Sequence, residues 1–334
     1  MKFLIKACIS CSLSFFVVLI SFVIGHTSVT GVCSNCHTMH NSQNGAAVAK
    51  DDSGSVTSTP HDALLIYSCL GCHTATSNTT WKDPFTKAPI ILNTVGTNYG
   101  YNNEGLSAGN FYNVVSSDNT GHNVLAGNDD GTLGNTPPGG SALGTKIQCA
   151  GTAGCHGNRT ESNQITDLKG AHHTVDTTID GNTVGRSYRF LKGITGIEDD
   201  DWEQETATNH NWYKGAIGDS DPSTISYLCA ECHGNFHSQS GIGTQSPWFR
   251  HPTDILLPQT GEYSVYDPAS GYSVKAPVAW TDPASPTRAT AVVMCLSCHR
   301  AHASPYFKMV RWDIKSGTLS TALSGCNVCH TSKN

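Results

Sequence analysis

Apolar positions along the chain fall in short runs, and no segment keeps a helical or strand period over any length. Residues 100–146 are rich in glycine, asparagine and proline, a composition typical of loops. We therefore expect no long amphipathic helix, a few strands near residues 258–280, and irregular backbone over about half of the chain or more.

One apolar run stands apart from this pattern. Leu13 to Ile24 is continuously apolar apart from two serines and follows Lys2 and Lys6, which is the layout of an export signal. The run is short for a membrane span. We predict a signal peptide over residues 1–25, cleaved after Gly25, and a mature domain over residues 26–334 without a membrane span. The alternative is a retained membrane anchor.

Composition and charge limit the possible partners. The chain has 334 residues, 38% of them hydrophobic and 14% charged, so it is not a disordered chain. Loss of Lys2 and Lys6 with the signal leaves 18 basic and 26 acidic residues, a net charge of −8. An acidic chain without a basic patch is not expected to bind nucleic acid.

The cysteines carry the strongest signal. Two of the 14 lie in the signal peptide, and the other twelve form six pairs, each followed directly by histidine. Five pairs are C-x-x-C-H and one is C-x5-C-H, with the insert built from small residues. The pairs with their histidines are Cys33, Cys36 and His37; Cys69, Cys72 and His73; Cys149, Cys155 and His156; Cys229, Cys232 and His233; Cys295, Cys298 and His299; Cys326, Cys329 and His330.

C-x-x-C-H is the attachment signature of c-type haem. Two thiols must reach the two vinyl groups on one edge of the porphyrin, and the next residue must place an imidazole beneath the iron. Disulfides or zinc sites would also use paired cysteines, but neither requires a histidine after the second one. The sequence therefore predicts six haem c groups with six proximal histidines. The expected fold is a mostly irregular multihaem cytochrome c with short helices at the motifs and a few short strands, in which the haem stack serves as the core.

Nine further histidines follow the first motif, enough to give every iron a second imidazole and so an electron-carrying site. Only three methionines follow the signal, so methionine is a poor alternative ligand. For His61 and His210 a structural role is at least as well supported as ligation, and we expect one of the adjacent His172 and His173 to ligate. The distal candidates are His40, His122, His172, His173, His237, His251 and His302.

Three of these candidates follow a proximal histidine closely. His40 and His302 come three residues later and His237 four residues later, so each would share a face of a helical turn with its proximal histidine. Axial ligands approach an iron from opposite sides of the ring. Each of the three is therefore either a surface histidine or a ligand to a different haem, which would bring two haems close together.

Several segments resemble the outer-surface hexahaem cytochromes of metal-reducing bacteria. They are residues 33–42 (CSNCHTMHNS), 121–127 (GHNVLAG), 250–252 (RHP), 295–304 (CLSCHRAHAS) and 326–330 (CNVCH). The resemblance implies two histidines on every haem and subunits that polymerise into extracellular nanowires. It also implies that His40 binds the haem attached at Cys295 and Cys298 of the neighbouring subunit.

The chain departs from this family at the third site, which in the family is C-x-x-C-H followed by D-P-H. Here the longer motif is followed by Gly157-Asn158-Arg159, so the distal ligand of that region is expected elsewhere, with His172 or His173 as candidates. Residues 157–228 carry no haem motif and are expected to form a haem-free insert.

The favoured function is a secreted electron conduit, extracellular or on the outer cell surface, with other cytochromes and acceptors such as metal oxides as partners. A monomeric shuttle on the surface or in the periplasm is the alternative. A multihaem oxyanion reductase is disfavoured because all six motifs end in histidine and spare histidines abound, so we expect an electron-transfer protein and no enzyme.

Overall fold

A computed structural model describes most of the chain after the predicted signal peptide, which lies outside the described residues. The described residues are 29, 31–51, 55–75, 81–83, 86–93, 106–115, 117–125, 134–199, 208–237 and 250–332.

Regular elements in this part of the chain are short. The helices are α1 (Cys69–His73), α2 (Gln164–Asp167), α3 (Ile225–His237), α4 (Leu319–Ala322) and α5 (Cys326–Cys329). The strands are β1 (Ser42–Gln43), β2 (Ala46–Ala47), β3 (Thr74–Ala75), β4 (Leu92–Asn93), β5 (Gln148–Ala150), β6 (Gly154–His156), β7 (Gly196–Ile197), β8 (Trp212–Lys214), β9 (Ile255–Leu256), β10 (Ala279–Trp280) and β11 (Ala291–Val293). Single 3₁₀ turns, such as Cys33–Asn35 and Cys295–Ser297, connect them.

The largest sheet has the strand order β7-β8-β10-β11-β9. Strand β10 runs parallel to β8, and the other three pairings are antiparallel. Two strands of this sheet, β7 and β8, come from the predicted haem-free insert, so residues 157–228 share a sheet with the C-terminal part of the chain. Near residues 258–280, strand β9 lies just before that range and β10 lies at its end.

This sheet separates two apolar clusters. Because side chains alternate along a strand, Val292 packs into one cluster while Ala291 and Val293 pack into the other. A third cluster surrounds Leu70 and Phe111 nearer the N-terminus. All three include or contact residues of the cysteine motifs: Leu296 and Cys155 at the first, Cys329 at the second, and Leu70 at the third.

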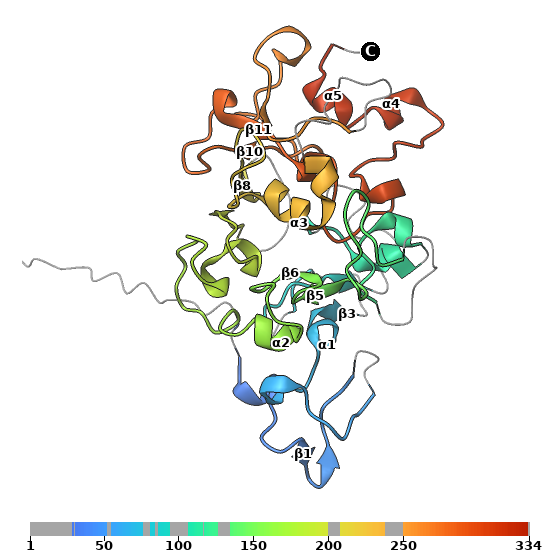
Figure 1. The fold of residues 1–334 in the computed structure, drawn as a ribbon, viewed down its shortest axis with the longest axis vertical. Helices are drawn as coiled ribbons and strands as arrows, with labels where there is room; N and C mark the ends of the chain where they lie inside the picture. The colour runs from blue at the N-terminus through green and yellow to red at the C-terminus, as the bar shows by residue number, and fades with distance from the viewer. Residues whose placement is uncertain are drawn as a thin grey trace, which may run out of the picture.

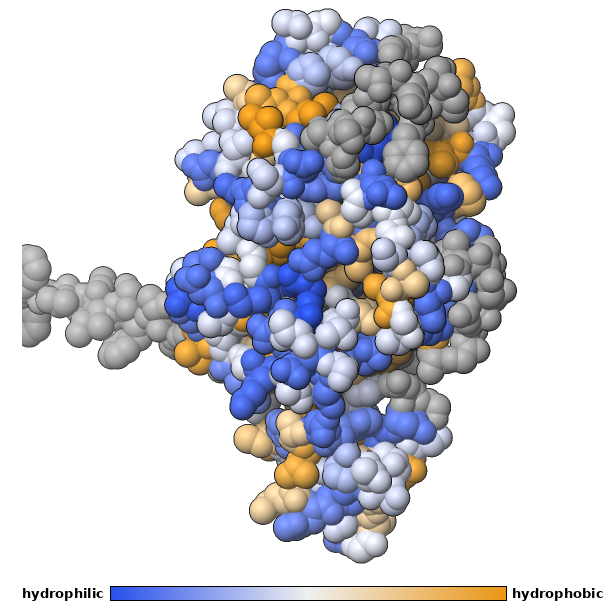
Figure 2. All heavy atoms as spheres, in the orientation of Figure 1, coloured by the Kyte–Doolittle hydropathy of each residue, from blue (hydrophilic) through white to orange (hydrophobic). Residues whose placement is uncertain are grey.

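The molecule is elongated, and the chain progresses along its long axis (Figure 1). The lobe with β1 forms one end, the β5-β6 pair lies in the middle, and α5 lies at the opposite end. The first lobe exposes the apolar side chains of Val32, Met39, Val56 and Leu64, and hydrophobic residues are visible among polar ones at this end in Figure 2. The motifs are therefore spread from one end of the protein to the other.

The predicted fold class is confirmed: the chain is mostly irregular, with short helices and a few short strands. Among the described residues, none of the helices has the length and apolar character that a bilayer crossing requires.

Candidate haem-binding sites

The C-x-x-C-H motifs form helical turns, four of them short and that of the fourth motif within the longer helix α3. The second motif is α1, where the Ser68 hydroxyl accepts a hydrogen bond from the Gly71 amide at 3.3 Å and caps the helix. In the first motif the His37 amide donates to the Cys33 carbonyl at 2.8 Å, and in the fifth the His299 amide donates to Cys295 at 3.1 Å. Such a turn places the two thiols, three residues apart, on one face.

The longer third motif reaches the same result by strand pairing. Strands β5 and β6 are parallel, and Gln148 pairs with Gly154 while Ala150 pairs with His156. This register places Cys149 opposite Cys155 on neighbouring strands, and side chains at matched positions of a parallel pair point to the same side. The five-residue spacer is therefore a small loop that restores the proximity of two thiols.

Two side chains that the sequence analysis did not single out hold this loop. The Gln164 side-chain oxygen accepts from the amides of Cys149 and Ala150 at 3.0 and 3.2 Å. The buried Asp167 carboxylate accepts from four backbone amides, those of Gly151, Arg159, Thr160 and Glu161, at 2.9–3.2 Å. No sequence pattern announces this role, because an aspartate eleven residues after the motif has no recognised spacing.

Burial favours the protonated form of several motif thiols. It raises the pKa of Cys72, Cys155 and Cys329 to about 11 and that of Cys298 to about 12. Zinc ligation and nucleophilic catalysis both need thiolates, which this environment disfavours. The twelve thiols form no disulfide, and the described residues hold no cluster of three metal-ligating side chains.

The motif histidines are oriented by their Nδ1 atoms. Since a carbonyl only accepts, each Nδ1 donates to it, and Nε2 is left without hydrogen as the metal-binding atom. The acceptors are the carbonyls of Ala63 for His37, Pro89 for His73, Arg189 for His156, Pro138 for His233 and Lys308 for His299, at 2.7–3.0 Å. His330 directs Nδ1 to the Glu262 carboxylate at 3.2 Å. This is the outer-shell arrangement of metal-bound imidazole.

Five motif histidines face a second imidazole across a gap of constant width. A metal ion held between two imidazole nitrogens at about 2.0 Å each separates the ring centres by about 6 Å. The ring-centre distances are 6.0 Å for His37 and His173, 6.4 Å for His73 and His172, 6.3 Å for His156 and His302, 6.0 Å for His122 and His233, and 6.2 Å for His251 and His330. The donor sets therefore fit iron between two histidines.

The facing histidines are themselves prepared as neutral ligands. His122 directs Nδ1 to the Ala301 carbonyl at 2.7 Å and His251 to that of Pro252 at 2.8 Å. Burial lowers the pKa of His172 to about 4 and that of His302 to about 3, so both rings are neutral at neutral pH. Neutral imidazole is the form that binds metal.

The pairing differs from the sequence analysis at two points. His172 and His173 both face a motif histidine, whereas we expected one of them to do so. His237 faces no motif histidine; its Nε2 lies 3.0 Å from the buried Asp254 carboxylate. The third motif, which lacks a nearby histidine, faces His302 from the far end of the sequence.

His40 and His299 remain outside these pairs. Among the described residues, no histidine ring lies opposite that of His299 at the spacing found for the other five motif histidines. His40 is exposed on the N-terminal lobe. His61 instead contacts the Lys50 carbonyl through Nε2 at 2.7 Å.

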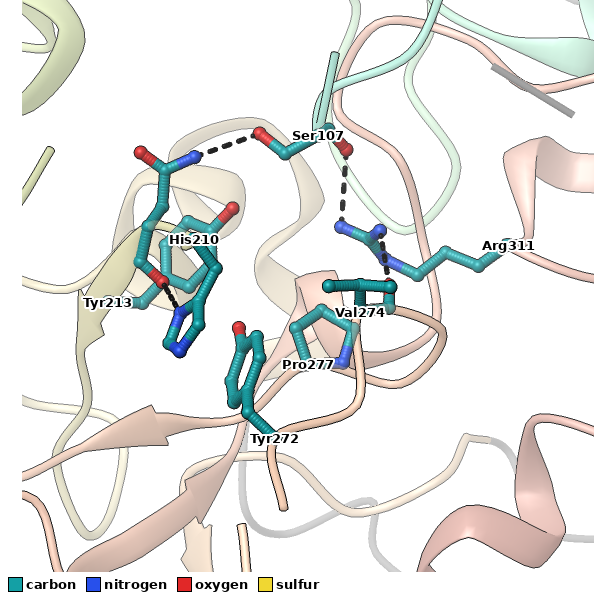
Figure 3. Close-up of a pocket in the computed structure, with 8 residues that line it drawn as sticks. Ser107, His210, Tyr213, Tyr272, Val274, Pro277 and Arg311 are labelled. Carbon is teal, nitrogen blue, oxygen red and sulfur yellow. Dashed lines mark hydrogen bonds between the residues drawn. The ribbon is translucent and has the colours of Figure 1, made fainter. Parts of the chain in front are cut away.

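His210 is a structural residue within an aromatic cluster. Its ring stacks on Tyr272 at 3.5 Å and lies 4.3 Å from Trp212. Figure 3 shows it beside Tyr272 and Tyr213, with Arg311 on the other side of a cavity of about 10 Å³. That is room for about one water molecule, so the cavity is not a substrate pocket.

Cysteine motifs that are consecutive in the sequence are also neighbours in the structure. After burial, the next influence that raises the pKa of Cys72 is the Cys36 thiol, and for Cys155 it is Cys232. The Cys229 thiol interacts with that of Cys295, and Cys298 interacts with Cys326. His156 interacts with His73, which closes the remaining gap between the second and third sites. The six sites therefore form one continuous row.

Known proteins provide a comparison for this arrangement of motifs and histidines. No family model matches the chain. The chain is 27% identical to the C-type cytochrome OmcS of Geobacter sulfurreducens over an alignment of 365 positions, which covers 86% of this chain and 80% of the relative. The cryo-EM structure of OmcS nanowires from Geobacter sulfurreducens superposes with a TM-score of 0.52 and 21% identity, covering 92% of this chain and all of the other.

By its fold and its motifs, the chain is similar to multihaem c-type cytochromes. Within that class it resembles OmcS, a cytochrome whose subunits form nanowires, and the resemblance predicted from the sequence is confirmed.

Proposed function

We propose that this protein is a secreted electron-transfer cytochrome that conducts electrons through six haem c groups, each held between two histidines. The observation that carries the proposal is the set of five imidazole pairs with ring centres 6.0–6.4 Å apart. Similarity to OmcS and the row of six cysteine motifs support it.

The proposed ligand sets follow from these pairs. The twelve motif cysteines form the thioethers, and the motif histidines are the proximal ligands. The distal ligands, in the order of the motifs, are His173, His172, His302, His122, His40 of a neighbouring subunit, and His251. His237 is left out of the set because Asp254 occupies its Nε2.

Haem iron supplies a one-electron couple when bound. Two histidines would hold each iron, with one of them supplied by a neighbouring subunit at the fifth site, which would leave no site for a substrate and favours transfer over catalysis. The Nδ1 hydrogen bonds of the motif histidines fix their ring orientations, and the motif turns hold successive sites in contact. Electrons would then pass along the long axis of the molecule.

Assembly into filaments follows from the unpaired fifth site. His299 needs a second imidazole, and His40 is presented on an exposed lobe together with Met39, which is 80% exposed. Insertion of this lobe into the next subunit would complete the site and bury apolar surface. Extracellular acceptors such as metal oxides, and other cytochromes as donors, are the partners that such a filament would serve.

The variant His40→Ala tests this proposal. Filaments seen in electron micrographs of the wild type should be lost, while intact mass still shows six haems per chain. His61→Ala in the same lobe is the matched control and should assemble normally. Filaments that persist in His40→Ala would refute the intersubunit ligand, and a wild-type monomer would favour the shuttle. A mature protein without six haems by mass would refute the cytochrome itself.

A further inference from the structure

Two arginine side chains are buried beside the fifth motif. Arg300 and Arg311 are 4% and 6% exposed. The Arg311 amide donates to the Cys298 carbonyl at 2.8 Å and its Nε donates to the Leu296 carbonyl at 2.7 Å. Arg311 is therefore fixed against the motif by its backbone and by its side chain.

Arg300 is a buried cation bonded to neutral groups. Its guanidinium donates to the carbonyls of Leu106 and Ser107 at 2.9 and 3.4 Å. No carboxylate forms an ion pair with Arg300 in the part of the chain that the structure describes. Arginine stays protonated in proteins, so the Arg300 side chain carries its charge at neutral pH.

The positive field reaches the donor atoms of the motif. The bond from the Arg311 Nε to the Leu296 carbonyl holds that guanidinium beside the segment between the two cysteines, and Arg300 directly follows His299 in the chain. Charges interact strongly in a low-dielectric interior, so an ion held by His299 would experience the same field.

We propose that Arg300 and Arg311 raise the reduction potential of the haem attached at Cys295 and Cys298, making it the highest of the six. The proposal rests on the proposed haem binding. When one electron passes to this site from a neighbouring haem, one iron is oxidised and the other reduced, and no proton is required. A fixed cation stabilises the reduced form because reduction lowers the positive charge of the site by one.

The consequence is an electron trap placed at the junction between subunits. The fifth site is the one whose second imidazole the neighbour would supply. An electron that arrives there would remain longest on the haem next to the contact between two subunits.

Redox titration of the holoprotein, followed by visible spectra, tests the proposal. Arg300→Met and Arg311→Met should each lower the highest-potential component by at least tenfold in its equilibrium constant, about 59 mV for one electron. Arg300→Lys and Arg311→Lys should retain it. Arg300→Gln, which keeps hydrogen-bond donors, replaces Arg300→Met if that variant does not fold.

Lys308→Met is the matched control. The Lys308 charge also acts on His299, but this side chain is exposed and water screens it. Removing it should shift the component much less than removing a buried arginine. An unchanged highest-potential component in both charge-removing variants, with six haems present by mass, would overturn this inference alone. Absence of the haems would instead refute the proposed function.

Discussion

At the scale of single residues, the structure separates histidines by what their nitrogens contact. A histidine that directs Nδ1 to a carbonyl and Nε2 to a gap of metal-site width is prepared as a ligand. His237 has the opposite arrangement, because its Nε2 faces the Asp254 carboxylate, and Asp254 is 1% exposed. That contact raises the pKa of His237 against the opposing effect of burial.

His237→Gln should therefore keep six haems but lose stability. Removing one partner of a buried ion pair costs about 3 kcal/mol or more. The folded-state pKa of His237 is raised, so its contribution is complete below about pH 6.5 and is lost as the pH rises through the folded pKa. Denaturant unfolding at pH 5.5 and 8.5 should show a larger loss at pH 5.5.

His61→Gln, whose ring meets the Lys50 carbonyl, is the control and should lack this pH dependence. Carbon monoxide binding by one haem of reduced His237→Gln would contradict the assignment and return His237 to the ligand set, because a haem that loses a histidine ligand stays attached through its thioethers.

The sequence alone was sufficient to identify the two cysteines and the motif histidine of each proposed site. Adjacency fixes the cysteines and the motif histidine, so the pattern alone identifies them. The facing histidine comes from a distant segment, as with His156 and His302, and only the folded chain brings the two together. The carbonyls that orient the rings were invisible in the sequence because every residue carries one.

At the scale of elements, tight turns and very short strands position the side chains of the cysteine motifs. The expected strands near residues 258–280 exist as β9 and β10, but β8, the parallel partner of β10, comes from the insert, and no local pattern encodes that pairing. The third motif shows why a longer spacer is tolerated. Strand register brings Cys149 and Cys155 together, and the Asp167 carboxylate fixes the loop between them.

Asp167→Asn should weaken this element. Burial alone would raise the pKa of Asp167, but hydrogen bonds from backbone amides outweigh it and the net shift is downward. The charged acceptor therefore adds stability that is complete above about pH 3.9 and is lost as the pH falls through the folded pKa. We expect a loss of about 2 kcal/mol in denaturant unfolding at pH 7.

Asp282→Asn is the control, since that exposed carboxylate accepts one amide, from Ala284 at 3.0 Å. An equal loss in both variants would mean that the buried network around Asp167 has no special role.

At the scale of the whole molecule, the row of sites is complete within one chain except at the fifth. Five imidazole pairs form internally, and the remaining members, His299 and His40, belong to different parts of the elongated molecule. Under the proposed function, a single chain would supply all twelve thiols and every histidine ligand except the second one of the fifth site.

Carbon monoxide binding should reveal this shortage. The reduced His40→Ala monomer should bind one carbon monoxide per six haems, because one iron lacks its second imidazole, and added imidazole should compete for that position. Wild-type filaments should bind none. Spectroscopic titration gives the stoichiometry, and a value of zero in the monomer would show that another residue fills the fifth site.

The adjacency of His172 and His173 has a mechanical consequence. Consecutive Cα atoms are fixed about 3.8 Å apart by the peptide bond, so the rings that face the first and second sites are tethered by a single rigid link. Bending or warming a filament would strain noncovalent contacts long before it changed the covalent link between His172 and His173. The spacing between those two sites, and with it the ease of hopping, would stay constant while the rest of the wire flexes.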